Sequence, residues 1–231
     1  MRTLWLLSAV LSMISPVPAA AAAFEASPED GRIRVLAFKK GLFSGFAHDH
    51  RFEAAAWHVT AQVPEGDPAG LSVTVVVEAG SLHDHQEGLT DAERAEVDAK
   101  TAGADVLDAA HHPEVTWRSQ GATLKPAAGK DRSLRGTARG QLTLRGRTRP
   151  ADLAFEAERD GESWRVKGKG RLLQTDFGIS PFSGFLGTVG VKDEIEIEIE
   201  VTLRPASPQG ASAAPLTPAP EAGEPTPKSP P

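Results

Sequence analysis

The feature that most constrains the fold is a strict alternation of apolar and acidic side chains near the C-terminal end of the chain. Between residues 194 and 203, every odd position is Ile, Val or Leu, and the even positions up to Glu200 are all Glu. Residues two apart in a β-strand point to the same face of a sheet. The segment therefore predicts a strand with one buried face and one face in water.

Seven further segments show the same alternation more weakly and predict more strands. They are residues 32–38, 52–63, 71–78, 114–119, 134–144, 151–158 and 164–173. Turn-forming residues separate many of them, as expected for hairpins. About eight strands with one apolar face, and no helices alternating with them, predict an all-β antiparallel fold. The pattern alone leaves a closed barrel and a sandwich open.

One segment departs from the strand pattern and predicts an inserted α-helix. Thr90 and Glu93 have the spacing of a capping box, and the residues that follow, up to position 106, are helix formers apart from Gly103.

The two ends of the chain differ from its middle. Residues 1–23 carry Arg2, an apolar run and an alanine tract, which is the order of a secretory signal peptide, so we expect a periplasmic or secreted protein. Residues 205–231 are rich in Pro and Ala and are expected to be a disordered tail. The folded domain is then residues 24–204, without a transmembrane segment.

Composition excludes several kinds of chemistry. The chain has no cysteine, which rules out disulfides, thiolate metal sites and cysteine nucleophiles. Its formal net charge of −6 argues against nucleic acid as a partner. No nucleophile elbow, phosphate-binding loop or zinc-protease motif is present, so we expect a protein that is not an enzyme and requires no cofactor.

Four stretches resemble the YceI-like family. They are VLDAAHHPEVTWRS at 106–119, GQLTLRGRTRP at 140–150, TDFGI at 175–179 followed by VKDEI at 191–195, and GFAHDH at 45–50. The last stretch is similar to a histidine-bearing subgroup. The resemblance runs from about residue 32 to 203 and implies an extended, lipocalin-like β-barrel that encloses a polyisoprenoid or another lipid.

Aromatic residues are candidates for the walls and entrance of such a pocket. A Phe-Ser-Gly-Phe sequence occurs twice, and barrel mouths are common binding sites, although filling the core is the simpler role for the same side chains. The candidates are Phe43, Phe46, Trp57, Trp117, Phe155, Trp164, Phe177, Phe182 and Phe185.

Two polar groups could bind a ligand or a metal. Arg145, Arg147 and Arg149 surround Gly146 and could meet a lipid phosphate or an anionic membrane surface, or could simply be a solvated hairpin. Two His-Asp-His tripeptides offer candidate ligands for a divalent metal, or residues that shape turns and strand ends. The metal candidates are His48, Asp49, His50, His83 and His85.

Three functions remain open from the sequence: a carrier of an apolar small molecule, a metal-binding or metal-dependent protein, and a filled barrel that binds another protein. Small residues at inward strand positions favour a hollow barrel and hence the carrier. They are Ala54, Ala56, Gly136, Ala138, Gly168 and Gly170.

Overall fold

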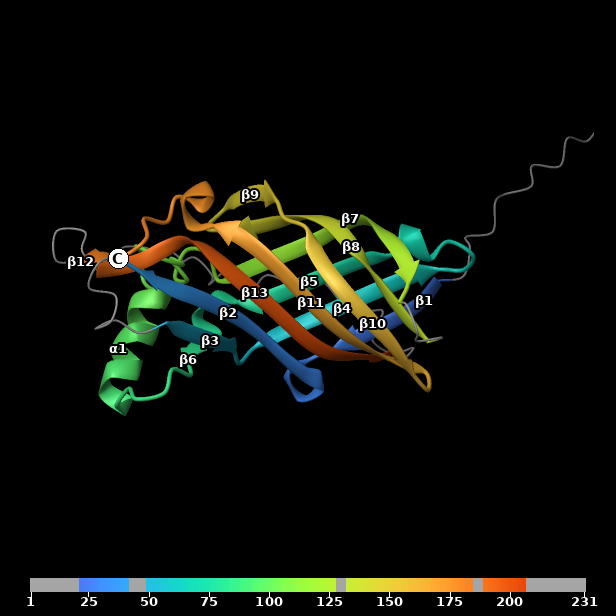
Figure 1. Ribbon diagram of the computed structural model, residues 1–231, viewed down its shortest axis with the longest axis horizontal. Coiled ribbons are helices and arrows are strands. Elements are labelled where there is room, and N and C mark those ends of the chain that lie inside the picture. Colours follow the sequence, from blue (N-terminus) through green and yellow to red (C-terminus); the bar gives the residue numbers. More distant parts are fainter. Residues whose placement is uncertain (1–20, 42–48, 128–131, 185–188, 207–231) are drawn as a thin grey trace, which may run out of the picture.

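The computed structural model describes residues 21–41, 49–127, 132–184 and 189–206. Over these residues the chain forms a closed, eight-stranded antiparallel barrel with an α-helix at one end (Figure 1). The prediction of an all-β barrel with one inserted helix is confirmed, and the sandwich is excluded.

The barrel closes through hydrogen bonding between its first and last strands. β1 pairs with β4 on one side and with β13 on the other, which leaves no free edge in the circuit. In order around the barrel, the strands are β1 (Ala21–Ala26), β4 (Trp57–Pro64), β5 (Ser72–Glu78), β7 (Glu114–Pro126), β8 (Ser133–Leu144), β10 (Leu153–Asp160), β11 (Ser163–Leu173) and β13 (Val189–Pro205).

Five further strands of the described residues lie outside this eight-stranded circuit. They are β2 (Gly31–Lys40), β3 (His50–Ala54) and β6 (Leu82–Asp84), which continue the sheet beyond β13, while β9 (Arg147–Pro150) pairs with β8 and β12 (Ser183–Gly184) pairs with β13. The prediction of one strand over residues 52–63 is wrong, because the chain bends between β3 and β4. At the bend, the amides of Ala55 and Ala56 donate to Ser81 at 2.9 and 3.1 Å instead of to a neighbouring strand.

The inserted helix, α1 (Asp91–Ala102), begins as the sequence predicts. The amide of Glu93 donates to Thr90 Oγ1 at 3.3 Å, and the amide of Thr90 donates to Glu93 Oε2 at 2.8 Å, which completes the capping box. The helix ends at Ala102 rather than near residue 106, because Gly103 adopts an extended conformation. No helix in the described ranges is both long enough and apolar enough to cross a bilayer.

The alternation in β13 separates the inside of the barrel from its outside. Ile199 and Val201 are buried in the core. The intervening glutamates lie on the outer surface, where Glu198 pairs with Lys169 at 2.8 Å and Glu200 with Arg32 at 3.0 Å. The predicted strand with one wet face is therefore confirmed.

Candidate functional site: an apolar cavity inside the barrel

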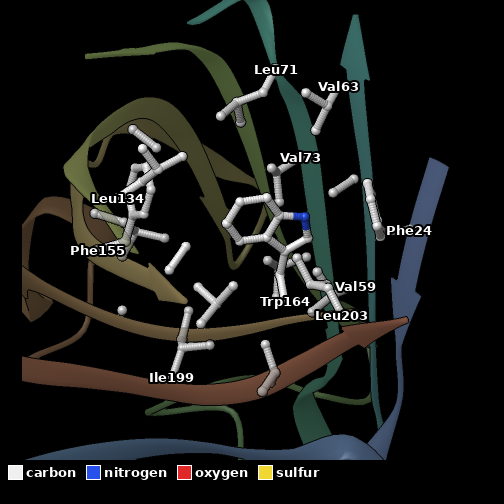
Figure 2. Close-up of a pocket in the computed structure, with 18 of the residues that line it drawn as sticks. Phe24, Val59, Val63, Leu71, Val73, Leu134, Phe155, Trp164, Ile199 and Leu203 are labelled. Atoms are coloured by element: carbon white, nitrogen blue, oxygen red, sulfur yellow. The ribbon is translucent and has the colours of Figure 1, made fainter. Parts of the chain in front are cut away.

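The barrel encloses a cavity of about 260 Å³ whose walls are almost entirely apolar. Its lining comes from all eight strands, so it is an interior space and not a cleft between loops. Figure 2 shows Trp164 between Leu134 and Phe155 on one side and Phe24 and Val59 on the other. Further wall residues are Ala61, Val63, Leu71, Val73, Val75, Trp117, Leu124, Ala138, Leu153, Ala157, Val166, Gly168, Ile199, Val201 and Leu203.

A second apolar cavity of about 90 Å³ adjoins the first, toward the helix end of the barrel. The two cavities share four wall residues, Val75, Trp117, Leu153 and Ile199. The interior therefore consists of two chambers that adjoin at these four side chains. Together they give the barrel an elongated apolar interior.

Small residues leave this space open, although not all of those predicted do so. Ala138 and Gly168 line the larger chamber, and Gly170 lines the smaller. Gly136 has a different role, because a Cβ at that position would overlap the backbone of Thr123. Ala54 is buried and lines neither chamber, and Ala56 lies at the bend between β3 and β4.

Trp117 is fixed where the two chambers meet. Its Nε1 donates a hydrogen bond of 2.8 Å to the carbonyl oxygen of Ala151. Its ring packs directly over Gly140, where any Cβ would overlap the ring atoms. The glycine therefore determines where the indole lies, and the indole determines the width between the chambers.

The structure distributes the nine aromatic candidates among different environments. Trp117, Phe155 and Trp164 line the larger chamber. Trp57 and Phe177 are buried elsewhere in the core, and Phe182 is 64% exposed. Phe43, Phe46 and Phe185 lie outside the described residues. Most of the wall is aliphatic, and the alternation within each strand was the sequence signal that could have identified it.

The three candidate arginines lie on the β8–β9 hairpin and do not line the larger chamber. Arg145 and Gly146 both have positive φ, of 49° and 67°, as a two-residue hairpin turn requires. The guanidinium of Arg145 donates to the carbonyls of Ala104 at 2.8 Å and Gly178 at 3.0 Å, so it fastens two loops together.

The other two arginines of this hairpin also contact the protein itself. Arg147 packs on the backbone of Gly178, where a Cβ would lie 2.6 Å from its guanidinium carbon. Arg149 donates to the carbonyl of Thr148 at 2.9 Å. A headgroup role for this hairpin stays a prediction, and it would have to operate away from the larger chamber.

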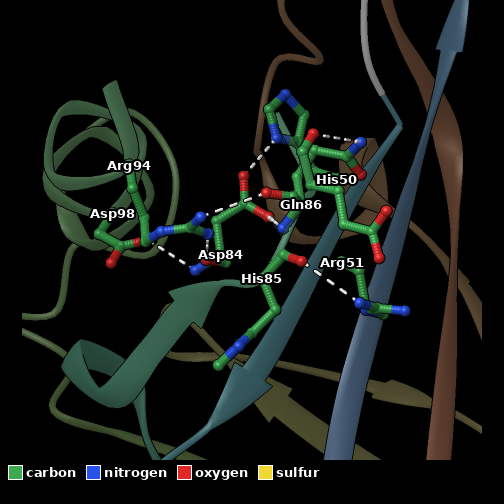
Figure 3. Close-up of polar contacts among 8 residues, drawn as sticks. His50, Arg51, Asp84, His85, Gln86, Arg94 and Asp98 are labelled. Carbon is green, nitrogen blue, oxygen red and sulfur yellow. Dashed lines mark hydrogen bonds and ion pairs between the residues drawn. The ribbon is translucent and has the colours of Figure 1, made fainter. Parts of the chain in front are cut away.

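Two of the candidate histidines, His50 and His83, contact carboxylates near α1. Figure 3 shows the contact of His50 with Asp84. His50 Nδ1 lies 2.6 Å from Oδ2 of Asp84, a completely buried side chain whose Oδ1 also accepts from the amide of Gln86 at 2.9 Å. His83 Nδ1 lies 3.0 Å from Oδ2 of Asp98 on the helix. These contacts join β3, β6 and α1.

Neighbouring backbone contacts strengthen the same junction. Asp98 Oδ1 accepts from the amide of Asp84 at 2.7 Å, and Arg94 donates to the carbonyls of Asp84 and Gln86. Asp49 accepts from the amide of Lys39, and the carbonyl of His85 accepts from Arg51 at 3.3 Å.

Within the described ranges no three His, Asp or Glu side chains gather as a metal site, and His48 lies outside them. Metal binding stays a prediction.

Comparisons with known families and solved structures find matches to the domain that contains this cavity. A family model described as a YceI-like domain matches residues 28–203. The crystal structure of Burkholderia cenocepacia BcnA has a TM-score of 0.56 at 15% identity, covering 74% of this chain and 95% of that one. A polyisoprenoid binding domain from Saccharophagus degradans has a TM-score of 0.53 at 10% identity, covering 81% and 100%. Comparison with curated protein sequences finds no match.

Proposed function

Because this chain belongs to the family of YceI-like domains, we propose that it is a non-catalytic binding protein that carries or sequesters a polyisoprenoid or another lipid inside its barrel. The observation that carries the proposal is the apolar cavity of about 260 Å³ within a closed barrel. A barrel filled by its own side chains would leave no such space.

The walls of the cavity fit an apolar chain better than a polar ligand. A polar molecule would lose its hydrogen bonds to water and find almost no partners there. An apolar chain gains about 0.8 kcal/mol for each methylene taken out of water. The adjoining chamber of about 90 Å³ extends the apolar interior past Trp117, which favours an elongated guest. The polyisoprenoid binding domain that shares this fold supports the same class of ligand.

We also propose that the protein is exported and acts in the periplasm or outside the cell. The order of charge, apolar run and alanines in residues 1–23 supports this. β1 begins at Ala21, so cleavage near Ala23 would make Phe24, a cavity wall residue, the new N-terminal residue or its neighbour. N-terminal sequencing of the protein purified from cell fractions tests both the export and the cleavage site.

Tryptophan fluorescence tests the proposed binding. Trp117 and Trp164 line the cavity, whereas Trp57 does not. We expect titration with geranylgeraniol, a short polyisoprenoid alcohol, to change the emission of the wild type. Trp164→Phe should reduce the amplitude of that change, and the matched control Trp57→Phe should retain it.

Two results would contradict the proposal. One is an unchanged emission spectrum together with no shift of the melting temperature on adding geranylgeraniol, because a ligand that binds the folded state must stabilise it. The other is an equal loss of amplitude in the two variants, because that would place the ligand outside the cavity.

A further inference from the structure

The end of the cavity remote from α1 carries one charged residue on an otherwise apolar wall. Along β10, the side chains of Leu153, Phe155 and Ala157 line the cavity, and the next inward position is Arg159. Among the described residues that line the cavity, Arg159 alone is charged. Because Arg159 is the last of these inward positions, near the end of β10, its charge lies at the rim of the cavity.

Two contacts hold the guanidinium of Arg159 at this rim. Arg159 and Trp164 are paired across β10 and β11, and the guanidinium carbon lies 5.2 Å from the centroid of the Trp164 ring. Arg159 Nε donates to the carbonyl of Gly161 at 2.7 Å. The side chain is therefore oriented, and only one of its five N–H groups is used in doing so.

The charge of Arg159 is not neutralised by the surrounding protein. Across the described part of the chain, no carboxylate lies within 4.0 Å of its guanidinium, and its two terminal nitrogens meet no acceptor. Two arginines on the adjacent strand β11 are paired: Arg165 with Asp160 at 2.6 Å, and Arg171, on the wall of the smaller chamber toward the helix end, with Glu196 at 2.9 Å.

At the other end of the interior, the described wall residues offer no unpaired cation. The smaller chamber has two charged wall residues, Asp152 and Arg171, and Arg171 already pairs with Glu196 at 2.9 Å. A guest with one anionic end would therefore be accommodated with its chain toward Trp117 and its head at Arg159.

We propose that Arg159, positioned on Trp164, binds the anionic head of an amphiphile whose chain fills the cavity. The terminal nitrogens of Arg159 match a carboxylate or a phosphate oxygen pair, the two groups that a guanidinium binds in bidentate fashion. This inference rests on the proposed function and narrows its ligand class from any apolar chain to one with an oxyanion at its end.

The test compares three ligands with the same twelve-carbon chain: dodecanoate, dodecyl phosphate and dodecanol. Their affinities are measured by displacement of a fluorescent apolar probe, with the wild type, Arg159→Gln and the matched control Arg165→Gln. We expect the wild type to prefer both anions to the alcohol. Arg159→Gln should weaken both anions about tenfold, as expected for loss of a charge-assisted contact, and leave dodecanol unchanged. Arg165→Gln should change none of the three.

Each alternative outcome has a distinct meaning. Equal affinity of dodecanol and dodecanoate for the wild type, or no effect of Arg159→Gln on the anions, overturns the headgroup site and leaves the carrier function intact. Probe displacement by millimolar inorganic phosphate or acetate, without a chain, would show an isolated anion site and overturn the coupling of head to chain. Failure of all three ligands to bind overturns the proposed function itself.

Discussion

Replacing Ala157 by Leu should weaken the binding of a long apolar ligand without destabilising the barrel. Ala157 lies on β10, is nearly buried and lines the larger chamber. The three added carbons would occupy space that the ligand needs. They would also fill part of a cavity that the free protein leaves open, so binding and stability should change in opposite directions.

The size of the effect follows from the displaced ligand atoms. A guest that must withdraw about three methylenes loses about 0.8 kcal/mol for each, or about 2.4 kcal/mol in total. At 25 °C this corresponds to a dissociation constant roughly 50-fold higher. Filling a cavity commonly stabilises a folded protein by about 0.5–2 kcal/mol, so the free energy of unfolding should be unchanged or higher.

Probe displacement by dodecanoate gives the affinities, and urea denaturation gives the free energies of unfolding. The matched control is Ala154→Leu, which adds the same three carbons to an exposed position of the same strand. It should leave both quantities close to those of the wild type. Unchanged affinity in Ala157→Leu, or an equal loss of affinity in both variants, would refute the assignment of the cavity as the binding site.

Three further predictions concern the side chains that support the barrel. Gly140→Ala should lower the free energy of unfolding by about 1–3 kcal/mol in urea denaturation, because its Cβ overlaps Trp117; no loss would show that the indole can move freely. His50→Ala should cost about 2 kcal/mol by the same measurement, because it removes a partner of a buried carboxylate; a smaller cost in a fully folded variant would contradict that role. The hydrogen bond from Thr175 lowers the pKa of Asp193, so Thr175→Val should raise that pKa in an NMR titration. A depressed pKa of Asp193 stabilises the folded state at pH values above the pKa of the unfolded state. The wild type should therefore have the higher free energy of unfolding at neutral pH, and its advantage over Thr175→Val should disappear as the pH falls through the folded-state pKa. An advantage that does not change with pH would contradict the role of this hydrogen bond.

Local sequence was sufficient to predict those structural features that depend only on residues close together in the chain. The alternation in residues 194–203 predicted β13 and its inward face because strand periodicity is a local property. The capping box at Thr90 predicted the start of α1 for the same reason. The bend at Ala55 was missed because its amides bond to Ser81, a residue whose position depends on the folding of another strand.

The sequence by itself thus determined an antiparallel all-β fold with one apolar face to each strand, and the start of one helix. Closure into a barrel was decided by the pairing of β1 with β4 and β13. Only the tertiary structure decided which inward side chains fill the core and which surround a hollow, and it placed Arg159 rather than the β8–β9 arginines at the cavity. The physical reason is that a cavity is space left between strands distant in sequence, such as those carrying Phe24, Trp117 and Leu203. No periodicity within a single strand records how wide that space is once the barrel has closed.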